Sequence, residues 1–250
     1  SVNDRLMAVR DSKNAMLENY LNTIKGQVVS LSKDTMVIDA VTAFGRGASV
    51  FREELGLDES ALDKSKKSVL TYYRDEFGRQ YERQTGRSAE VNQFIARIDD
   101  DSIALQSAYI AENPNALGEK HQMDRAEADT AYNRVHGIYH PAIRAFLEEF
   151  GFYDVLLCDT HSGDVVYSVF KELDYSTSLI DGPFADSGLG EAFRRANTLG
   201  DSDFAIVDFK QYTPSYESPA STIASAVEEQ SITTKYITDN VNQTASAAET

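Results

Sequence analysis

The 250-residue sequence contains no tryptophan, a single cysteine and no long apolar run. One cysteine cannot form an internal disulfide or a cysteine-based zinc site, and Cys158 lies in an apolar stretch where we expect a packed thiol. No apolar stretch approaches the roughly 20 residues that span a bilayer, and no signal peptide precedes Ser1. The sequence therefore predicts no membrane-spanning helix, and a first residue other than methionine favours a processed chain or one cut from a longer protein.

Strongly basic stretches are absent as well. The chain has 40 Asp and Glu against 24 Lys and Arg, which gives a formal net charge of -16. A nucleic-acid-binding protein needs a basic surface that displaces counterions from phosphates. Nucleic acid is therefore excluded as an expected partner.

The common catalytic motifs are also missing: there is no Gly-x-Ser-x-Gly, no Walker A loop and no His-Glu-x-x-His. His136 and His140 have the spacing of one helical face, but Pro141 follows directly and no third metal ligand lies near them in the sequence. We expect these histidines to cap or pack, and we expect no metal, no cofactor and no enzymatic activity. A hydrolase that uses one of them with a carboxylate is the enzymatic alternative.

The first half of the sequence has helical periodicity. Apolar residues spaced by three, four or seven from Leu6 to Ile38 predict one long helix in which Gly26 is tolerated. Breaks are expected near Gly45, Gly47 and Gly56, and the sequence Asn113-Pro114-Asn115 predicts another. Further helices are predicted at Ser60–Arg83 (ending at Thr85-Gly86), Val91–Ile98, Ser102–Glu112, Met123–His136 and Pro141–Phe150.

The pattern then changes to that of strands. Tyr153–Asp159 and Asp164–Phe170 flank the turn Thr160–Gly163 and predict an antiparallel hairpin. A short helix, Glu191–Asn197, and a third strand, Phe204–Phe209, are expected to follow. Helices first and strands second predict an α+β fold, with long, bundle-like N-terminal helices followed by a small antiparallel sheet.

The last segment again has a helical repeat. From Ile223 to Ala248, apolar, small and polar residues alternate by four and three, which predicts a heptad helix with a half-polar seam. A surface tail with accidental spacing is the alternative, and residues 219–227 also alternate tolerably as a strand.

Tyrosine is abundant, with 13 residues. Each offers an apolar ring and a polar tip, so several could line a small-ligand pocket while others pack in the core. The candidates are Tyr72, Tyr73, Tyr139, Tyr153, Tyr167, Tyr175, Tyr212 and Tyr216.

Several segments together resemble a known family. They are LMAVR (residues 6–10), YHPAIRAFLEEFGFYD (139–154), VVYSVFKELD (165–174), SLIDGPFADSGLGEAFR (178–194) and FKQYTPSYESPA (209–220). They are similar to the sensor regions of bacterial methyl-accepting chemotaxis proteins and of related membrane-bound histidine kinases and cyclases. The resemblance is specific around the hairpin and loose between residues 53 and 129.

The resemblance implies a Cache-like, PAS-related domain on the periplasmic side of an inner-membrane receptor. Such a domain binds an unknown small molecule, works as a homodimer, and contacts the membrane only through flanking helices absent from this chain. It implies ligand-binding roles for five residues near the sheet, with Lys171 pairing a ligand carboxylate and Asp208 an ammonium group. The five residues are Tyr167, Lys171, Asp208, Tyr212 and Tyr216.

One segment departs from the family. Where another strand pair is expected, TIASAVEEQSITTK (222–235) instead resembles the cytoplasmic signalling helix of the same receptors. The chain then divides into a helical region (1–138), a Cache-like antiparallel sensor (139–220) and a coiled-coil-like segment (221–250). Because the sheet would lack strands, a dimerisation or interaction module that binds no ligand is the alternative function.

Overall fold

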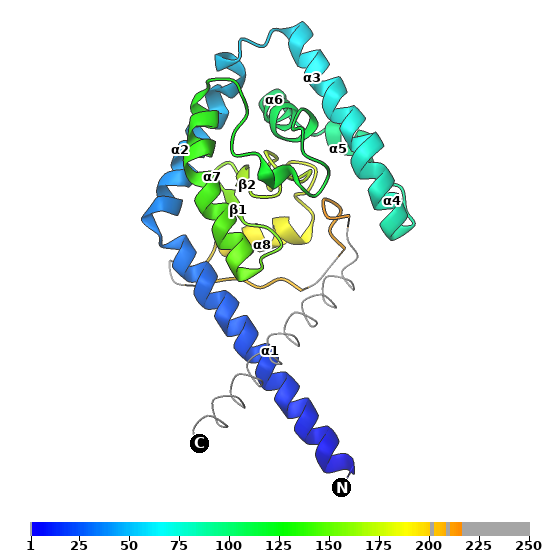
Figure 1. The fold of residues 1–250 in the computed structure, drawn as a ribbon, viewed down its shortest axis with the longest axis vertical. Coiled ribbons are helices and arrows are strands. Elements are labelled where there is room, and N and C mark those ends of the chain that lie inside the picture. Colours follow the sequence, from blue (N-terminus) through cyan, green and yellow to red (C-terminus); the bar gives the residue numbers. More distant parts are fainter. Residues whose placement is uncertain (1, 201–202, 209–210, 217–250) are drawn as a thin grey trace, which may run out of the picture.

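The computed structural model describes residues 2–200, 203–208 and 211–216. Over these residues the protein is mostly helical, with a small antiparallel sheet, so the predicted α+β class with a helical majority is confirmed. Figure 1 shows a long helix leading into a body in which the other helices surround the sheet. The predicted heptad helix at 221–250 lies outside the described residues.

Two helices form where one was expected. α1 (Val2–Ser32) and α2 (Thr35–Glu54) are separated because Asp34 is extended and its side chain accepts a hydrogen bond from the backbone N–H of Met36. A carboxylate at this position satisfies a free N–H of the helix start, so the prediction of one helix through Ile38 was wrong. Most of α1 extends away from the body (Figure 1). Its exposed large apolar side chains are Leu6, Met7, Val9, Leu17, Tyr20, Leu21 and Val28.

The glycines at 45 and 47 do not break α2. Gly47 instead permits close packing, because a β-carbon there would lie 2.8 Å from the Cα and 2.9 Å from the backbone N of Tyr132 in α7 (Ala131–Phe150). Helix breaking by glycine is weak, and the gain from packing α2 on α7 outweighs it. The predicted break at Gly56 is confirmed, since that residue has φ +61° just beyond α2.

Replacing Gly47 with alanine is expected to destabilise the protein by about 1–3 kcal/mol, because the new methyl group meets backbone atoms that cannot rotate away. Gly26→Ala in α1 is the matched control. Nothing lies within 4 Å of its β-carbon, so higher helix propensity should add up to about 1 kcal/mol. Urea denaturation measures both variants. Equal effects of the two substitutions would contradict the close α2–α7 contact.

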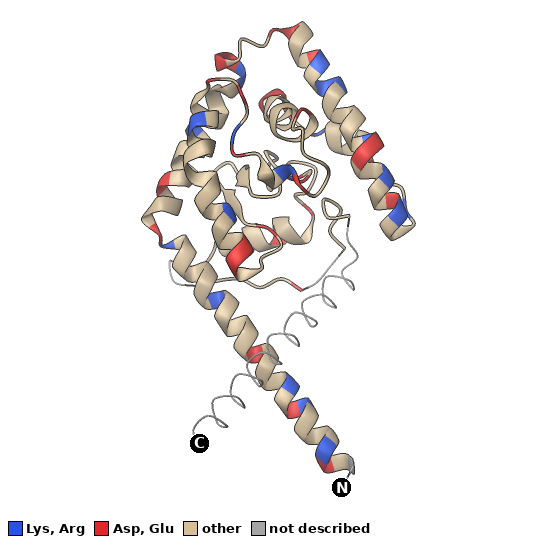
Figure 2. Ribbon diagram, viewed as in Figure 1, with Lys and Arg blue, Asp and Glu red and all other residues tan. Residues whose placement is uncertain are grey.

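The middle of the chain matches its predicted helices. α3 (Glu59–Tyr72), a π-helical turn η1 (Tyr73–Gly78) and α4 (Arg79–Thr85) follow one another and end at Gly86, whose φ is +69°. α5 (Val91–Ile95) is shorter than predicted. α6 (Asp100–Gln106) continues into the π-helical turn η2 (Ser107–Ala111), and η3 (Lys120–Gln122) is a single 3-10 turn. Figure 2 shows acidic and basic residues interspersed along α1 and α3.

α7 corrects the prediction of two helices around Pro141. It is continuous from Ala131 to Phe150, and residues 123–130 are not helical. Pro141 has no N–H for the carbonyl of Gly137. The helix persists because its inward face, spaced by three and four, is buried in the core, and burial outweighs one lost hydrogen bond. The buried residues of this face include His136, His140, Ile143 and Leu147.

The hairpin is confirmed, with shorter strands than predicted. β1 (Leu156–Cys158) pairs with β2 (Val165–Ser168) in antiparallel register, Leu157 opposite Tyr167. Gly163 ends the turn with φ +76°. Beyond Ser168, the N–H of Val169 donates to the carbonyl of Val155, and the carboxylate of Asp154 accepts a hydrogen bond from the N–H of Phe170.

The last described elements differ in part from the prediction. α8 (Gly188–Ala196) starts three residues earlier than expected, because the Ser187 hydroxyl accepts a hydrogen bond from the N–H of Gly190. Residues 203–208 contain no strand, so the predicted third strand is wrong there. This segment contacts side chains instead: Lys25 lies over the Phe204 ring at 4.6 Å, and Arg195 reaches the carbonyl of Ile206.

Candidate functional site

The segment that leaves β2 has an unusual backbone. Lys171 and Ser176 both adopt φ +60°, which side chains with a β-carbon rarely do. These two residues flank Asp174, and all three are almost completely buried. Strained backbone conformations cost free energy and persist only where the surrounding packing holds them, and they are common at functional sites.

The Lys171 ammonium is enclosed rather than solvated. It donates to the carbonyls of Ser168 and Val169 and lies 4.5 Å from the centre of the Tyr167 ring. The rings of Tyr175 and Tyr109 are 5.4 and 5.9 Å from it, so aromatic faces supply much of its stabilisation. Burial lowers the pKa of Lys171 to about 7, although the nearby Asp154 favours the charged form.

Asp154 is the acid that favours the charged form of this lysine. As a residue it is half-buried, but its carboxylate is enclosed by donors: the Ser168 hydroxyl at 2.7 Å and backbone N–H groups of residues 155, 169 and 170. Burial raises the pKa of Asp154, while these hydrogen bonds and Lys171 oppose the rise. The carboxylate therefore holds together the turn that positions Lys171.

Asp174 is the second buried acid. The Tyr212 hydroxyl donates to its Oδ2 at 2.5 Å, and Oδ1 has no hydrogen-bond partner among the described residues. Burial raises the pKa of Asp174 to about 7. A buried carboxylate oxygen without a donor carries a cost in free energy, which marks the group for a functional explanation.

Two histidines of α7 complete the cluster. His140 Nδ1 lies 2.7 Å from the Tyr167 hydroxyl and Nε2 lies 2.7 Å from the carbonyl of His121. A carbonyl oxygen only accepts, so Nε2 carries the proton of the neutral ring and Nδ1 accepts from the Tyr167 hydroxyl. Burial lowers the pKa of His140 to about 2 and that of the stacked His136 well below its usual value, so both rings are neutral. The described residues contain no group of three or more His, Cys, Asp and Glu suited to a metal ion.

Most of the predicted tyrosines belong to the core. Tyr73, Tyr167 and Tyr175 are fully buried with bonded hydroxyls, Tyr175 donating to Tyr132 at 2.8 Å. Tyr153 is exposed and donates to Glu172. The dominant role of these residues is packing, since each hydroxyl finds an acceptor inside the protein.

Four of the five predicted ligand-binding residues are brought together. Lys171 packs on Tyr167, it lines a small cavity with Tyr216, and Tyr212 reaches the same segment through Asp174. Asp208 is exposed in the segment 203–208. The sequence reasoning missed Asp154, Asp174 and Lys120, a buried lysine that lines the same small cavity as Lys171. Asp154 and Asp174 each end one of the family-like segments, and that position was the available signal.

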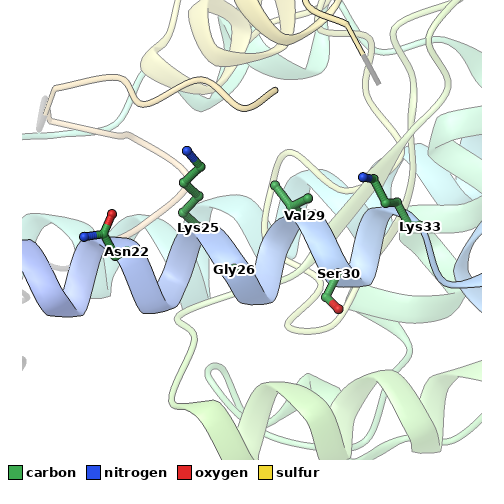
Figure 3. Close-up of a pocket in the computed structure, with 6 residues that line it drawn as sticks. All are labelled: Asn22, Lys25, Gly26, Val29, Ser30 and Lys33. Carbon is green, nitrogen blue, oxygen red and sulfur yellow. The ribbon is translucent and has the colours of Figure 1, made fainter. Parts of the chain in front are cut away.

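Two other depressions lie away from this cluster. A groove of about 620 Å³ runs along α1; five of its six lining residues belong to that helix, and the sixth, Lys33, directly follows it (Figure 3). A depression of about 360 Å³ beside the hairpin turn contains four aspartates. Three of these already have structural partners, since Asp99 caps α6, Asp101 pairs with Arg52, and Asp159 accepts from the turn.

No protein-family model, curated protein or solved structure matches this chain. Among the described residues, every helix is too short or too polar to cross a membrane.

Proposed function

We propose that this chain is the ligand-sensing region of a bacterial chemotaxis receptor, with a Cache-like domain that binds a small molecule and relays a helix displacement. The proposal includes an extracytoplasmic location at the inner membrane, a homodimer, and no catalytic role. It is supported by the resemblance of the hairpin and its flanking segments to such sensors. A small antiparallel sheet and a long helix, both present among the described residues, are two features that such sensors share.

The observation that carries the proposal is a packed connection between the site and the long helices. The Tyr167 ring, which faces the Lys171 ammonium, stacks on Phe44 of α2 with ring centres 4.7 Å apart. Phe44 is fully buried, so a shift of Tyr167 must move α2 or open a void. α2 joins α1 through two residues only, which gives a displacement a short path to the exposed helix.

The direct test is a thermal-shift screen with amino acids, carboxylates, amines and purines. A ligand that binds only the folded state raises the melting temperature, by about 5–10 °C at a hundredfold excess over its Kd. The shift should shrink in Lys171→Met and persist in Lys67→Met, a matched change at an exposed position of α3. A screen in which no compound shifts the melting temperature contradicts the sensor proposal.

The second candidate function is a dimerisation or interaction module that binds no small molecule. The exposed apolar residues of α1 favour it, since a second helix could cover them. A silent screen combined with a dimer in analytical ultracentrifugation would support this function instead. Ligand-induced stabilisation would remove it.

A further inference from the structure

The depression beside the hairpin turn is large enough for a small organic molecule. Its volume of about 360 Å³ lies within the range of roughly 300–1,000 Å³ that ligand pockets occupy. Its lining comes from α2, the start of α6, the hairpin and the segment that follows β2. Carboxylates, hydroxyl groups and short apolar side chains are combined there, so the depression can hold both a polar group and a carbon chain.

The lining is acidic on two sides. Asp99 and Asp101 lie at the start of α6, and Asp159 and Asp164 lie in the hairpin. None of the lining residues, all of which the structure describes, is Lys or Arg. Hydrogen bonds from the backbone of the turn lower the pKa of Asp159, so this carboxylate is ionised at neutral pH. The depression therefore attracts cations.

The structural partners of these aspartates leave acceptor atoms unused. Asp99 caps α6, Asp101 pairs with Arg52, and Asp159 accepts from the turn, in each case through Oδ1. The side chain of Asp164 makes no hydrogen bond or ion pair with any described residue. Its two oxygens, and Oδ2 of each of the other three, are therefore available to a bound cation.

Two deeply buried serine hydroxyls also face the depression. Ser102 in α6 is 7% exposed and Ser176 is 9% exposed, and both line the depression. Neither hydroxyl exchanges a hydrogen bond with a described residue, yet neither oxygen is sealed from solvent. The small exposed part of each residue thus includes its hydroxyl oxygen. A polar group at this depth is normally bonded inside the protein, so two unpaired hydroxyls at one depression indicate a binding surface.

The chemistry of the lining selects among cations. No three His, Cys, Asp or Glu side chains of the described residues are placed to hold one metal ion, so these carboxylates are too far apart to share one. Quaternary ammonium groups are bound by aromatic rings, and none of the lining residues, all described, is Phe, Tyr or Trp. A primary ammonium group instead has three N–H donors for separate carboxylates and hydroxyls. Leu105, Val165 and Val166 offer apolar contact to its carbon chain.

We propose that this depression is a binding site for a small aliphatic primary amine. The ammonium group donates to the Asp164 carboxylate and to the hydroxyls of Ser102 and Ser176, while the other three aspartates add to the attraction. Ser176 lies beside the hairpin, because its N–H donates to the carbonyl of Val165 at 3.0 Å. The site contains none of the five residues that the family resemblance assigns to ligand binding, and it is independent of the proposed sensor function.

Matched compounds test the ligand class on the wild-type chain. Ethylamine, propylamine and butylamine are compared with the corresponding alcohols and with tetramethylammonium, at neutral pH and equal ionic strength, by thermal shift and calorimetry. At least one amine should raise the melting temperature by about 5–10 °C at a hundredfold excess over its Kd, and its alcohol and tetramethylammonium should not. No effect of any amine, or an equal effect of the alcohol or of tetramethylammonium, would overturn the amine site.

Variants then locate the binding. Asp164→Asn keeps the shape of a side chain that has no hydrogen bond or ion pair with a described residue, and should weaken binding of the active amine roughly tenfold to a hundredfold. Ser102→Ala removes one unpaired hydroxyl and should weaken it roughly threefold to tenfold. The matched controls are Asp181→Asn, at an exposed position, and Ser65→Ala, within α3. Both should bind the amine as wild type does.

The pattern across the variants separates this site from the Lys171 cluster. If Asp164→Asn binds the amine as tightly as wild type, the depression is not the site. An amine whose effect is lost in Lys171→Met and kept in Asp164→Asn overturns the amine site and leaves the sensor function standing. The reverse pattern supports the amine site, and the other compounds of the screen then decide the sensor function.

Discussion

Replacing Asp174 with asparagine is expected to make the protein progressively more stable, relative to wild type, as the pH rises from 5 to 8. Burial raises the pKa of this carboxyl from 3.8 to about 7, and Asn keeps an oxygen that can accept from Tyr212. Ionisation inside the fold is what costs the wild type its stability. The amide removes that cost without changing the shape of the side chain.

The direction follows from proton binding in the two states. Between about pH 4 and 7 the unfolded chain carries an ionised Asp174, while the folded protein keeps it protonated. The folded state then binds more protons, so the contribution of this group to stability is present below pH 4 and is lost as the pH rises to 7. The full loss is about 4 kcal/mol, of which roughly 3 kcal/mol falls between pH 5 and 8.

Urea denaturation of both proteins across this range measures the difference directly. The free energy of unfolding of Asp174→Asn minus that of wild type should grow by about 3 kcal/mol from pH 5 to 8. Asp181→Asn, at an exposed position, is the control and should show no such trend. A difference that stays constant over the range would show that Asp174 is ionised in the folded protein throughout.

Replacing Asp154 with alanine is expected to cost roughly 3 kcal/mol at pH 7.5. Four donors then lose a bond: the Ser168 hydroxyl and the N–H groups of residues 155, 169 and 170, of which the Val169 N–H keeps its bond to the carbonyl of Val155. The negative charge that favours the protonated form of Lys171 is lost as well, and the turn after β2 loses the hydrogen bonds that hold it. Asp154→Asn, which keeps one acceptor oxygen, should fall between the alanine variant and wild type.

The control for Asp154 is Asp159→Ala. Asp159 also accepts two backbone N–H bonds, from His161 and Ser162, but it does so in the exposed hairpin turn. Water can replace those bonds, so the expected cost is about 1 kcal/mol. Equal losses for the two variants would mean that burial at Asp154 contributes nothing. Guanidinium denaturation midpoints at constant pH separate the outcomes.

Local signals in the sequence predicted the parts of the fold that local interactions decide. The hairpin is an example, because Gly163 at a turn with φ +76° between two apolar runs is encoded in four adjacent residues. The end of α4 at Gly86 is another. In both places the backbone angle itself requires glycine, so reading the residue type was sufficient.

The secondary-structure predictions fail where contacts between residues distant in the sequence determine the structure. Gly47 looked like a helix breaker, but its small size serves contact with Tyr132, 85 positions away in the chain. Pro141 looked like a helix start, but the buried face of α7 holds the helix through it. Phe204–Phe209 alternates like a strand, yet residues 203–208 meet α1 and α8 side chains instead of a sheet edge. No local pattern contains that information.

Only part of the candidate site could be predicted from the sequence, for the same reason. Tyr167 and Lys171 were found because they lie on the hairpin that resembles a known family. Lys120 begins η3, about 50 positions earlier in the chain, and lines the same small cavity as Lys171 only because segments distant in the sequence pack together. A lone lysine in a polar stretch of sequence gives no indication that it will be buried.

The single cysteine offers a practical route to observing motion of α1. Cys158 ends β1, and burial raises the pKa of its thiol to about 12. The thiolate is the form that reacts with maleimide, so the raised pKa slows the reaction of this thiol at neutral pH. A maleimide dye or spin label would therefore modify a cysteine introduced on the exposed face of α1 and leave the native thiol intact. The wild-type background is suited to site-specific labelling without any preparatory substitution.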